Sequence, residues 1–350
     1  MTPDAALRTA LQQLATGASL EAGAAAAAFD VVMRGEATPV QIAALLMGLR
    51  GKGETADEVA GAATALRRAM VRLELADGDG MVDTCGTGGG RVGTLNLSTA
   101  AAFVVAGAGV PVAKHGNRSF TSRSGSADVL EALGVEIGLA PARAAEVLEA
   151  AGLVFLFAPT YHPAMRHVGP VRRELAVPTI MNLLGPLANP AGVRRQVIGV
   201  ADPSRAPLMA AALARLGACH ALVLHAEIGM DEVSPWGATA VSEVREGAVL
   251  EWSLDPERFG LECGDLADLA GGEPADNASR LEALLEGRGP RAARCAVLLN
   301  AGAALYVSGN GWTLEAAMLR AAEALDGGAA REALERLRRA APRAGGGPTP

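Results

Sequence analysis

The chain has 350 residues, of which 50% are hydrophobic and only 3% aromatic, and its formal net charge at pH 7 is −7. This length is enough for two domains or one large one, with a sizeable core. The acidic balance and the scarcity of aromatic rings argue against nucleic-acid binding, which needs basic side chains and stacking surfaces. The four widely spaced cysteines fit no metal-ligand pattern, so we expect free thiols in a cytoplasmic protein.

The first seventy residues are predicted to be helical. Two capping boxes mark helix starts, Thr38 with Gln41 and Thr55 with Glu58. No residue in this region suggests chemistry of its own. Residues 1–75 are therefore expected to form a small all-helical domain that serves packing or dimerisation.

From residue 81 onward, short apolar segments alternate with stretches rich in Ala and Leu. This alternation predicts a larger α/β domain with a mostly parallel central sheet and helices on both faces. The expected strands are 81–83, 110–113, 154–157, 196–200 and 221–225, and the expected helices are 98–108, 127–133, 141–151 and 205–216.

Five prolines between Tyr161 and Pro190 break this rhythm. A segment within 163–195 is therefore expected to rejoin the helical domain. We expect the α/β domain to comprise residues 76–162 and 196–340. Residues 341–350 are rich in Gly and Pro, which predicts a disordered tail.

An uncharged stretch of 22 residues, Val92–Ala113, has the length of a membrane-spanning helix. It includes Asn96, Ser98, several glycines and Pro111, which divide it into pieces suited to a buried helix and a buried strand. The N-terminus also lacks the basic and apolar regions of a signal peptide. We therefore expect no association with membranes.

Gly88–Gly93 matches the pattern G-x-G-x-x-G, which alone is weak support for a dinucleotide site. Such a site needs an acidic residue about twenty positions later, and no Asp or Glu occurs between Arg91 and Ala127. No Gly-Lys-Ser or Gly-Lys-Thr follows the loop either. It is thus a phosphate loop of another kind or a simple turn. The hydroxyl-rich Asn96–Thr99 that comes next favours a helix start that binds an anion.

Lys114 is one of only two lysines, beside 29 arginines. This bias indicates that a compact point charge is needed at position 114, next to the turn His115–Ser119. An acidic pair, Asp231–Glu232, supplies the oxygen ligands that Mg²⁺ prefers. Side chains of adjacent residues on a strand face opposite ways, so both reach one ion only from a loop or bend. Together these features predict an enzyme that acts on a doubly phosphorylated small molecule.

These stretches resemble those of the anthranilate phosphoribosyltransferases of tryptophan biosynthesis, and the resemblance covers nearly the whole chain. Its most specific parts are Gly86–Gly89, Asn96–Thr99, Lys114–Ser119, Ser124–Gly134, Asn182–Pro190 and Gly229–Pro235. The resemblance implies a helical domain packed on an α/β domain, a homodimer formed through the helical part, and Mg²⁺ as cofactor. It also implies transfer of the phosphoribosyl group of phosphoribosyl pyrophosphate (PRPP) to the amine of anthranilate, with release of pyrophosphate.

The resemblance also implies roles for individual residues, with Lys114, Asn117 and Arg172 as the catalytic ones. The ligands of Mg²⁺ would be Ser98, Asp231 and Glu232. Anthranilate would be bound by Gly86, Asn117, His162, Met165 and Arg172. PRPP would be bound by Gly86, Gly89, Gly90, Thr94, Asn96, Leu97, Ser98, Thr99, Lys114, His115, Gly116, Asn117, Arg118, Ser119, Phe120, Thr121, Ser122 and Ser126.

One position departs from the pattern of this family. Gly90 stands where the family commonly has Asp, so a carboxylate beside the pyrophosphate site is missing. We therefore predict an altered dependence on Mg²⁺, or a weaker hold on the ion, rather than a loss of activity.

Two other functions stay open on the sequence. A pyrimidine nucleoside phosphorylase would share this fold and a phosphate turn with a lysine, but Asn117, Arg118 and the pair Asp231–Glu232 argue against it. A non-catalytic paralogue that binds nucleic acid is disfavoured by the net charge of −7. Arg172 favours an acceptor that carries a carboxylate, and the ring that carries it is not identified by the sequence.

Overall fold

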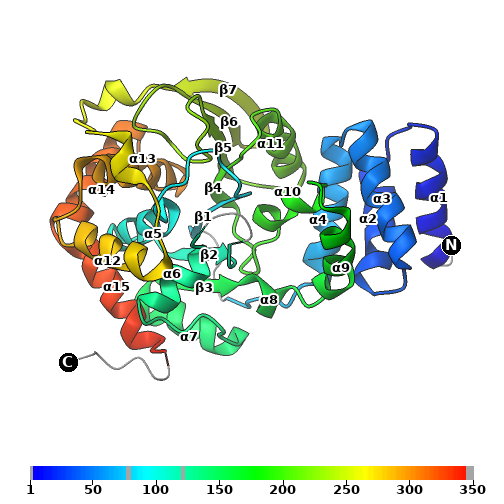
Figure 1. Cartoon of the computed structure of the whole chain (residues 1–350), viewed down its shortest axis with the longest axis horizontal. Helices are drawn as coiled ribbons and strands as arrows, with labels where there is room; N and C mark the ends of the chain where they lie inside the picture. The colour runs from blue at the N-terminus through cyan, green and yellow to red at the C-terminus, as the bar shows by residue number, and fades with distance from the viewer. Residues whose placement is uncertain (1–2, 76–79, 120–122, 344–350) are drawn as a thin grey trace.

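The computed structural model describes residues 3–75, 80–119 and 123–343. The N-terminal part is a helical bundle, on the right in Figure 1. Both predicted capping boxes are confirmed, because Thr38 and Thr55 each accept a backbone N–H three residues on, and Gln41 and Glu58 return the bond. The four helices are α1 (Pro3–Ala15), α2 (Ala22–Met33), α3 (Pro39–Lys52) and α4 (Ala56–Ala69).

Two helices from the middle of the chain complete this bundle. α9 (Met165–Leu175) packs against α2 and α3, and α10 (Met181–Leu187) packs against α4, as Figure 1 shows. Val168 and Leu184 share one apolar core with Leu45. The chain therefore returns to the helical part within the proline-rich segment, while the limits of the two domains stay a prediction.

The central sheet has seven strands in the order β3-β2-β1-β4-β5-β6-β7. The first five strands are all parallel, which confirms the α/β class and the five predicted strands to within a few residues. The antiparallel hairpin of β6 and β7 is not predicted by the sequence, because Ser242, Glu243 and Arg245 interrupt the apolar run of β6 and β7 is an exposed edge strand. The strands are β1 (Val82–Gly86), β2 (Val112–Gly116), β3 (Leu153–Phe157), β4 (Arg195–Gly199), β5 (His220–Ala226), β6 (Thr239–Arg245) and β7 (Ala248–Leu254).

Helices cover both faces of this sheet and give the molecule two apolar cores. α5 packs against α13, α14 and α15 on one face, and α11 lies on the other face, where it also contacts α4. The four predicted helices agree with α5, α6, α7 and α11 to within one residue at each end. The bounds are α5 (Leu97–Gly107), α6 (Ser126–Ala132), α7 (Pro141–Ala151), α8 (Ala158–Tyr161), α11 (Arg205–Arg215), α12 (Pro274–Leu285), α13 (Arg291–Val307), α14 (Leu314–Asp326) and α15 (Ala329–Ala340), with 3-10 turns at Pro256–Phe259 and Leu266–Leu269.

The predicted disordered tail is wrong for its first three residues. Ala341 is buried, and Arg343 donates its N–H to the carbonyl of Gly134 at 3.0 Å. Residues 344–350 lie outside the described part. Within the part of the chain that the structure describes, every helix is too short or too polar to cross a membrane.

Two strands diverge at the carboxyl end of the sheet. β1 and β2 share one paired position, Val82 with Val112, whereas β1 and β4 stay paired over the whole of β1. The chain passes from β1 to β2 and β3 on one side and then crosses to β4 on the other. The carboxyl ends of β1 and β4 therefore form the switch point of strand order, where open α/β sheets bind ligands.

Candidate active site

The glycine loop lies directly after β1 at this switch point. Gly89 has a φ of 89°, which glycine adopts without strain. Thr87 donates its N–H to the carbonyl of Gly199 at 2.8 Å, and Arg91 donates to that of Gly229 at 2.9 Å. The loop is thus fixed at both ends, to β4 and to the segment after β5, while Gly88 and Gly89 between them are exposed and Gly90 is half-buried.

Gly90 leaves space for the acidic pair. A Cβ atom at position 90 would lie 2.3 Å from Asp231 Oδ1, and the N–H of Gly90 donates to this carboxylate. Burial raises the pKa of Asp231. Asp231 and Glu232 lie on a bend after β5, the arrangement that allows both to reach one ion.

Glu232 links the acidic pair to the start of α5. Its Oε1 accepts the N–H of Ser98 at 3.2 Å, and its Oε2 accepts the hydroxyl of Thr94 at 3.1 Å. Desolvation, together with the neighbouring Asp231, raises the pKa of Glu232 to about 8. The two hydrogen bonds and the charge of Lys114 lower the pKa of Glu232, but they do not offset its desolvation.

The residues present fit Mg²⁺. Among the described residues no group of three or more His, Cys, Asp or Glu side chains is placed to hold a metal. Asp231, Glu232 and the hydroxyl of Ser98 supply hard oxygen donors without closing a cage. Such a partial set suits Mg²⁺, which keeps several waters and binds substrate phosphates.

Lys114 crosses the gap between β2 and β1. Its side chain is buried, its ammonium donates to a backbone carbonyl of β1, and it lies 3.3 Å from Ser98 Oγ. Burial lowers the pKa of Lys114, and the buried carboxylate of Asp83 opposes this shift. Asp83 accepts the N–H of His115 at 3.2 Å and the amide of Asn189 at 2.8 Å. Side chains therefore replace the backbone ladder where the two strands separate.

Asn96 joins the start of α5 to two distant segments. Its Nδ2 donates to the carbonyl of Ser124 at 3.1 Å, and its Oδ1 accepts from Asn277 Nδ2 at 3.0 Å. Asn277 is missed by the sequence analysis, because a single asparagine in an ordinary helical stretch carries no local signal. Leu97 and Thr99 are buried, and their backbone N–H groups donate to the carbonyls of Leu95 and Asn96, so these two residues shape the start of α5 rather than offering donors to a ligand.

The turn after β2 is held against α6. A Cβ atom on Gly116 would lie 2.3 Å from Ser126 Oγ, and this hydroxyl donates to the carbonyl of Asn117 at 3.3 Å. Arg118 pairs with two carboxylates of α6 at 2.8 and 2.5 Å, and Ser119 donates its N–H to one of them. Arg118 therefore orders the turn, and Phe120, Thr121 and Ser122 lie outside the described residues.

Two histidines connect this turn to the helical part. His115 Nε2 lies 3.2 Å from His162 Nε2, and His115 Nδ1 lies 3.1 Å from the carbonyl of Gly185. Burial, together with the neighbouring His162 ring, lowers the pKa of His115 to about 3. Burial lowers the pKa of His162 to about 4. This contact is not predicted from the sequence, where His162 is expected only beside the acceptor.

Arg172 and Met165 lie on α9. Both are partly exposed, and burial lowers the pKa of Arg172. No ion pair of Arg172 occurs within the described residues. A half-buried guanidinium without a carboxylate beside it suits an anionic ligand. The structure thus gathers Lys114, Ser98, Thr94 and the acidic pair at the sheet. Of the expected acceptor residues, Met165 and Arg172 lie on α9 on the helical side, whereas Gly86 ends β1 and Asn117 follows β2.

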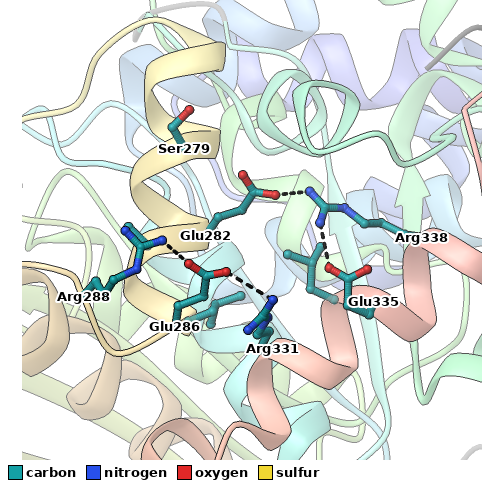
Figure 2. Close-up of a pocket in the computed structure, with 10 residues that line it drawn as sticks. Ser279, Glu282, Glu286, Arg288, Arg331, Glu335 and Arg338 are labelled. Carbon is teal, nitrogen blue, oxygen red and sulfur yellow. Dashed lines mark hydrogen bonds and ion pairs between the residues drawn. The ribbon is translucent and has the colours of Figure 1, made fainter. Parts of the chain in front are cut away.

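A pocket of about 490 Å³ lies elsewhere, between α12 and α15. Figure 2 shows its three glutamates and three arginines pointing toward one another. Arg338 pairs with Glu282 and Glu335, and Glu286 pairs with Arg288 and Arg331. Because its charges satisfy one another, this pocket is not the candidate site.

Comparisons with known proteins agree with this arrangement. Residues 8–70 match the glycosyl transferase family, helical bundle domain, and residues 78–331 match the glycosyl transferase family, a/b domain. The fold and the site therefore define a glycosyl transferase with a helical and an α/β part.

The relatives narrow this class. An anthranilate phosphoribosyltransferase of Rubrobacter xylanophilus is 50% identical over 97% of this chain and 99% of its own length. The crystal structure of the enzyme of this name from Thermus thermophilus has a TM-score of 0.89 at 44% identity and covers 95% of this chain and 98% of its own. The Saccharomyces cerevisiae enzyme in complex with PRPP and Mg has a TM-score of 0.85 at 28% identity, covering 96% and 98%. The chain belongs to the anthranilate phosphoribosyltransferase family.

Proposed function

We propose that this chain transfers the phosphoribosyl group of PRPP to the amine of anthranilate and releases pyrophosphate, the second step of tryptophan biosynthesis from chorismate. The observation that carries the proposal is the meeting of Lys114, Ser98 and Glu232 beside an exposed glycine loop. Backbone N–H groups, a cation and oxygen ligands at one place complement a diphosphate.

The site suits departure of pyrophosphate. As the bond from the sugar carbon to pyrophosphate breaks, negative charge grows on the departing oxygens. The N–H groups of Gly88 and Gly89 lie in a loop that is fixed at both ends, so they stabilise this charge without reorienting water. Lys114 adds a cation that is already held in place. Ser98, Asp231 and Glu232 would hold Mg²⁺, which would supply further positive charge to the pyrophosphate.

The acceptor needs positioning more than activation. An arylamine is unprotonated at neutral pH, so no strong base has to remove a proton before attack. Arg172 donates two N–H groups to the carboxylate of anthranilate, and Gly86 and Asn117 lie on the donor side of the amine. His162 and Met165 line the approach of the acceptor.

The two alternative functions are less well supported. Relatives that are 50% identical over nearly the full length are anthranilate phosphoribosyltransferases, which disfavours a nucleoside phosphorylase. The net charge of −7 disfavours a paralogue that binds nucleic acid.

The proposal is tested by mixing the purified protein with anthranilate, PRPP and Mg²⁺ and following the loss of anthranilate fluorescence. We expect a decay that requires all three components and is absent in Lys114→Ala. No decay in folded protein would contradict the proposal, and assays with other carboxylated arylamines and with nucleosides plus phosphate would then identify the activity.

We also propose a homodimer formed through the helical part. The outer side of α3 carries Val40, Ala44, Met47 and Gly51, an uncharged stripe in which Val40 is 78% exposed. Sedimentation is expected to give a dimer for the wild-type protein and a monomer for Val40→Lys combined with Met47→Lys. A monomeric wild type would contradict this proposal. All four cysteines are free thiols, which supports a cytoplasmic location.

A further inference from the structure

A segment late in the chain supports the glycine loop from behind. Leu95 donates its N–H to the carbonyl of Leu269 at 2.8 Å, and Gly271 donates to that of Gly93 at 3.0 Å. A Cβ atom on Gly271 would lie 2.4 Å from the carbonyl oxygen of Thr94. The approach is so close that this segment cannot shift without moving the loop.

Asn277, on the first turn of α12, extends this support to a side chain of the site. It is 2% exposed, and its Oδ1 accepts the N–H of Gly272 at 2.8 Å. A backbone N–H only donates, so this bond fixes which end of the amide is oxygen. The NH₂ group of Asn277 therefore faces Asn96 and donates to its Oδ1 at 3.0 Å.

Asn96 in turn is hydrogen-bonded to Ser124, in the segment between β2 and α6. Its Nδ2 donates to the carbonyl of Ser124, and its Oδ1 also accepts the hydroxyl of Ser124 at 3.3 Å. Ser124 lies directly before the N-cap residue of α6, and Asn96 is the N-cap residue of α5. The Asn96 amide thus holds the starts of α5, α6 and α12 at fixed spacing.

We propose that Asn277 is a positioning residue for PRPP, acting through Asn96 to set the distance between the glycine loop and the turn after β2. This inference rests on the proposed function, because it concerns the same donor site. It assigns a role to a residue that lies far from the loop in sequence and in no motif.

Two substitutions separate the contribution of the hydrogen bond from that of charge. Asn277→Asp keeps the acceptor for Gly272 and places an oxygen against Asn96 Oδ1, so the link breaks and a negative charge is added. Asn277→Ala breaks the link without adding charge. We expect both variants to raise the dissociation constant of PRPP, measured by calorimetry with Mg²⁺, about tenfold, the effect of losing one neutral hydrogen bond. The KM for PRPP rises in parallel, whereas kcat and the KM for anthranilate stay within about twofold of wild type.

Asn310→Asp is the matched control. Asn310 follows α13 at the opposite end of the sheet and donates to Ser308 Oγ at 2.9 Å, so the same amide-to-carboxylate change there should leave PRPP binding unaltered. The inference is overturned if only Asn277→Asp weakens PRPP binding, or if both variants lower the melting temperature with no selective change in the KM for PRPP. A wild-type protein that binds no PRPP would instead overturn the proposed function itself.

Discussion

Two glutamates near opposite ends of the sheet have very different surroundings. Glu243, on β6, is only 5% exposed, and its carboxylate accepts hydrogen bonds from His220 at 2.7 Å, Tyr306 at 2.9 Å and Trp252 at 2.8 Å. Glu232, after β5, is more exposed and accepts one backbone N–H at 3.2 Å and one hydroxyl at 3.1 Å.

Their pKa values shift in opposite directions. Burial alone would raise both, but the donors around Glu243 bring its pKa below the ordinary value, while desolvation and Asp231 raise that of Glu232 to about 8. The fold thus surrounds the Glu243 carboxylate with three donors and leaves the desolvation of the Glu232 carboxylate uncompensated. This difference distinguishes a structural network from a place made for a cation.

The largest expected effect comes from replacing the two glutamates in turn. Glu232→Gln is expected to lower kcat/KM by about 10²–10³-fold, the usual cost of removing a group that stabilises transition-state charge. Its melting temperature at pH 8 should not fall, because a carboxyl whose pKa is raised in the folded state opposes folding above its unfolded pKa. Glu243→Gln is expected to lose about 2–3 kcal/mol of unfolding free energy, because its NH₂ would face buried donors.

Fluorescence assays and urea unfolding of both variants test this comparison. Folded Glu243→Gln should keep nearly wild-type activity. If it loses activity as strongly as Glu232→Gln, the two glutamates do not differ in role and the comparison fails.

The same reasoning applies to two adjacent arginines of α9. Arg172 is half-buried without an ion pair in the described residues, whereas Arg173 is exposed. Arg172→Ala is expected to raise the KM for anthranilate about 10–100-fold, the value of a charge-assisted pair of hydrogen bonds. Arg173→Ala is the control and should leave it unchanged. Equal effects of the two substitutions in steady-state assays would show that Arg172 does not bind the acceptor carboxylate.

A third comparison concerns pH. The pKa values of His115 and His162 fall from 6.5 to about 3 and about 4 in the folded protein. Below pH 6.5 the unfolded chain therefore binds protons at these histidines more readily than the folded protein does. Their contribution to the free energy of unfolding is fully present above that pH and is lost as the pH falls toward 4. At pH 5 the neutral imidazole of each histidine is expected to lower the free energy of unfolding by about 2 kcal/mol relative to its value above pH 6.5.

Urea unfolding at pH 7.5 and pH 5.0 measures this loss. His162→Gln keeps a donor for His115 but does not titrate, so its loss between the two pH values should be about 2 kcal/mol smaller than that of the wild type. An unchanged pH dependence would show that the pair is not neutral in the folded protein.

The smallest expected effect concerns Gly90. Gly90→Asp adds a carboxylate beside Asp231 and should change the Mg²⁺ concentration for half-maximal activity several-fold. Gly90→Ala adds only a Cβ atom, 2.3 Å from Asp231 Oδ1, and separates crowding from charge. If the Mg²⁺ profile of Gly90→Asp matches that of the wild type, the missing carboxylate has no bearing on the metal.

The sequence predicts what local patterns encode. Capping boxes at Thr38 and Thr55 give the helix starts, and the apolar runs give the five parallel strands, because both depend on neighbours a few residues apart. The glycine loop, Lys114 and the acidic pair are found because each stands out against its surroundings in composition.

The rest depends on pairs that only the folded chain brings together. His115 meets His162, Asp83 meets Asn189, and Asn96 meets Asn277, each across many residues, and none has a periodic signal. β6 is missed for a related reason, since its buried Glu243 is satisfied by donors from three other elements. Buried polar side chains interrupt the apolar pattern by which a strand is predicted, and their hydrogen-bond partners cannot be identified from the sequence.

The return of α9 and α10 to the bundle has a consequence during synthesis. α1 to α4 leave the ribosome first. The apolar core around Leu45 is incomplete, however, until Val168 and Leu184 are synthesised about a hundred residues later. At about 5–20 residues per second, this delay is roughly 5–20 s. The nascent N-terminal helices therefore present apolar surface to chaperones for seconds before the rest of their own domain exists.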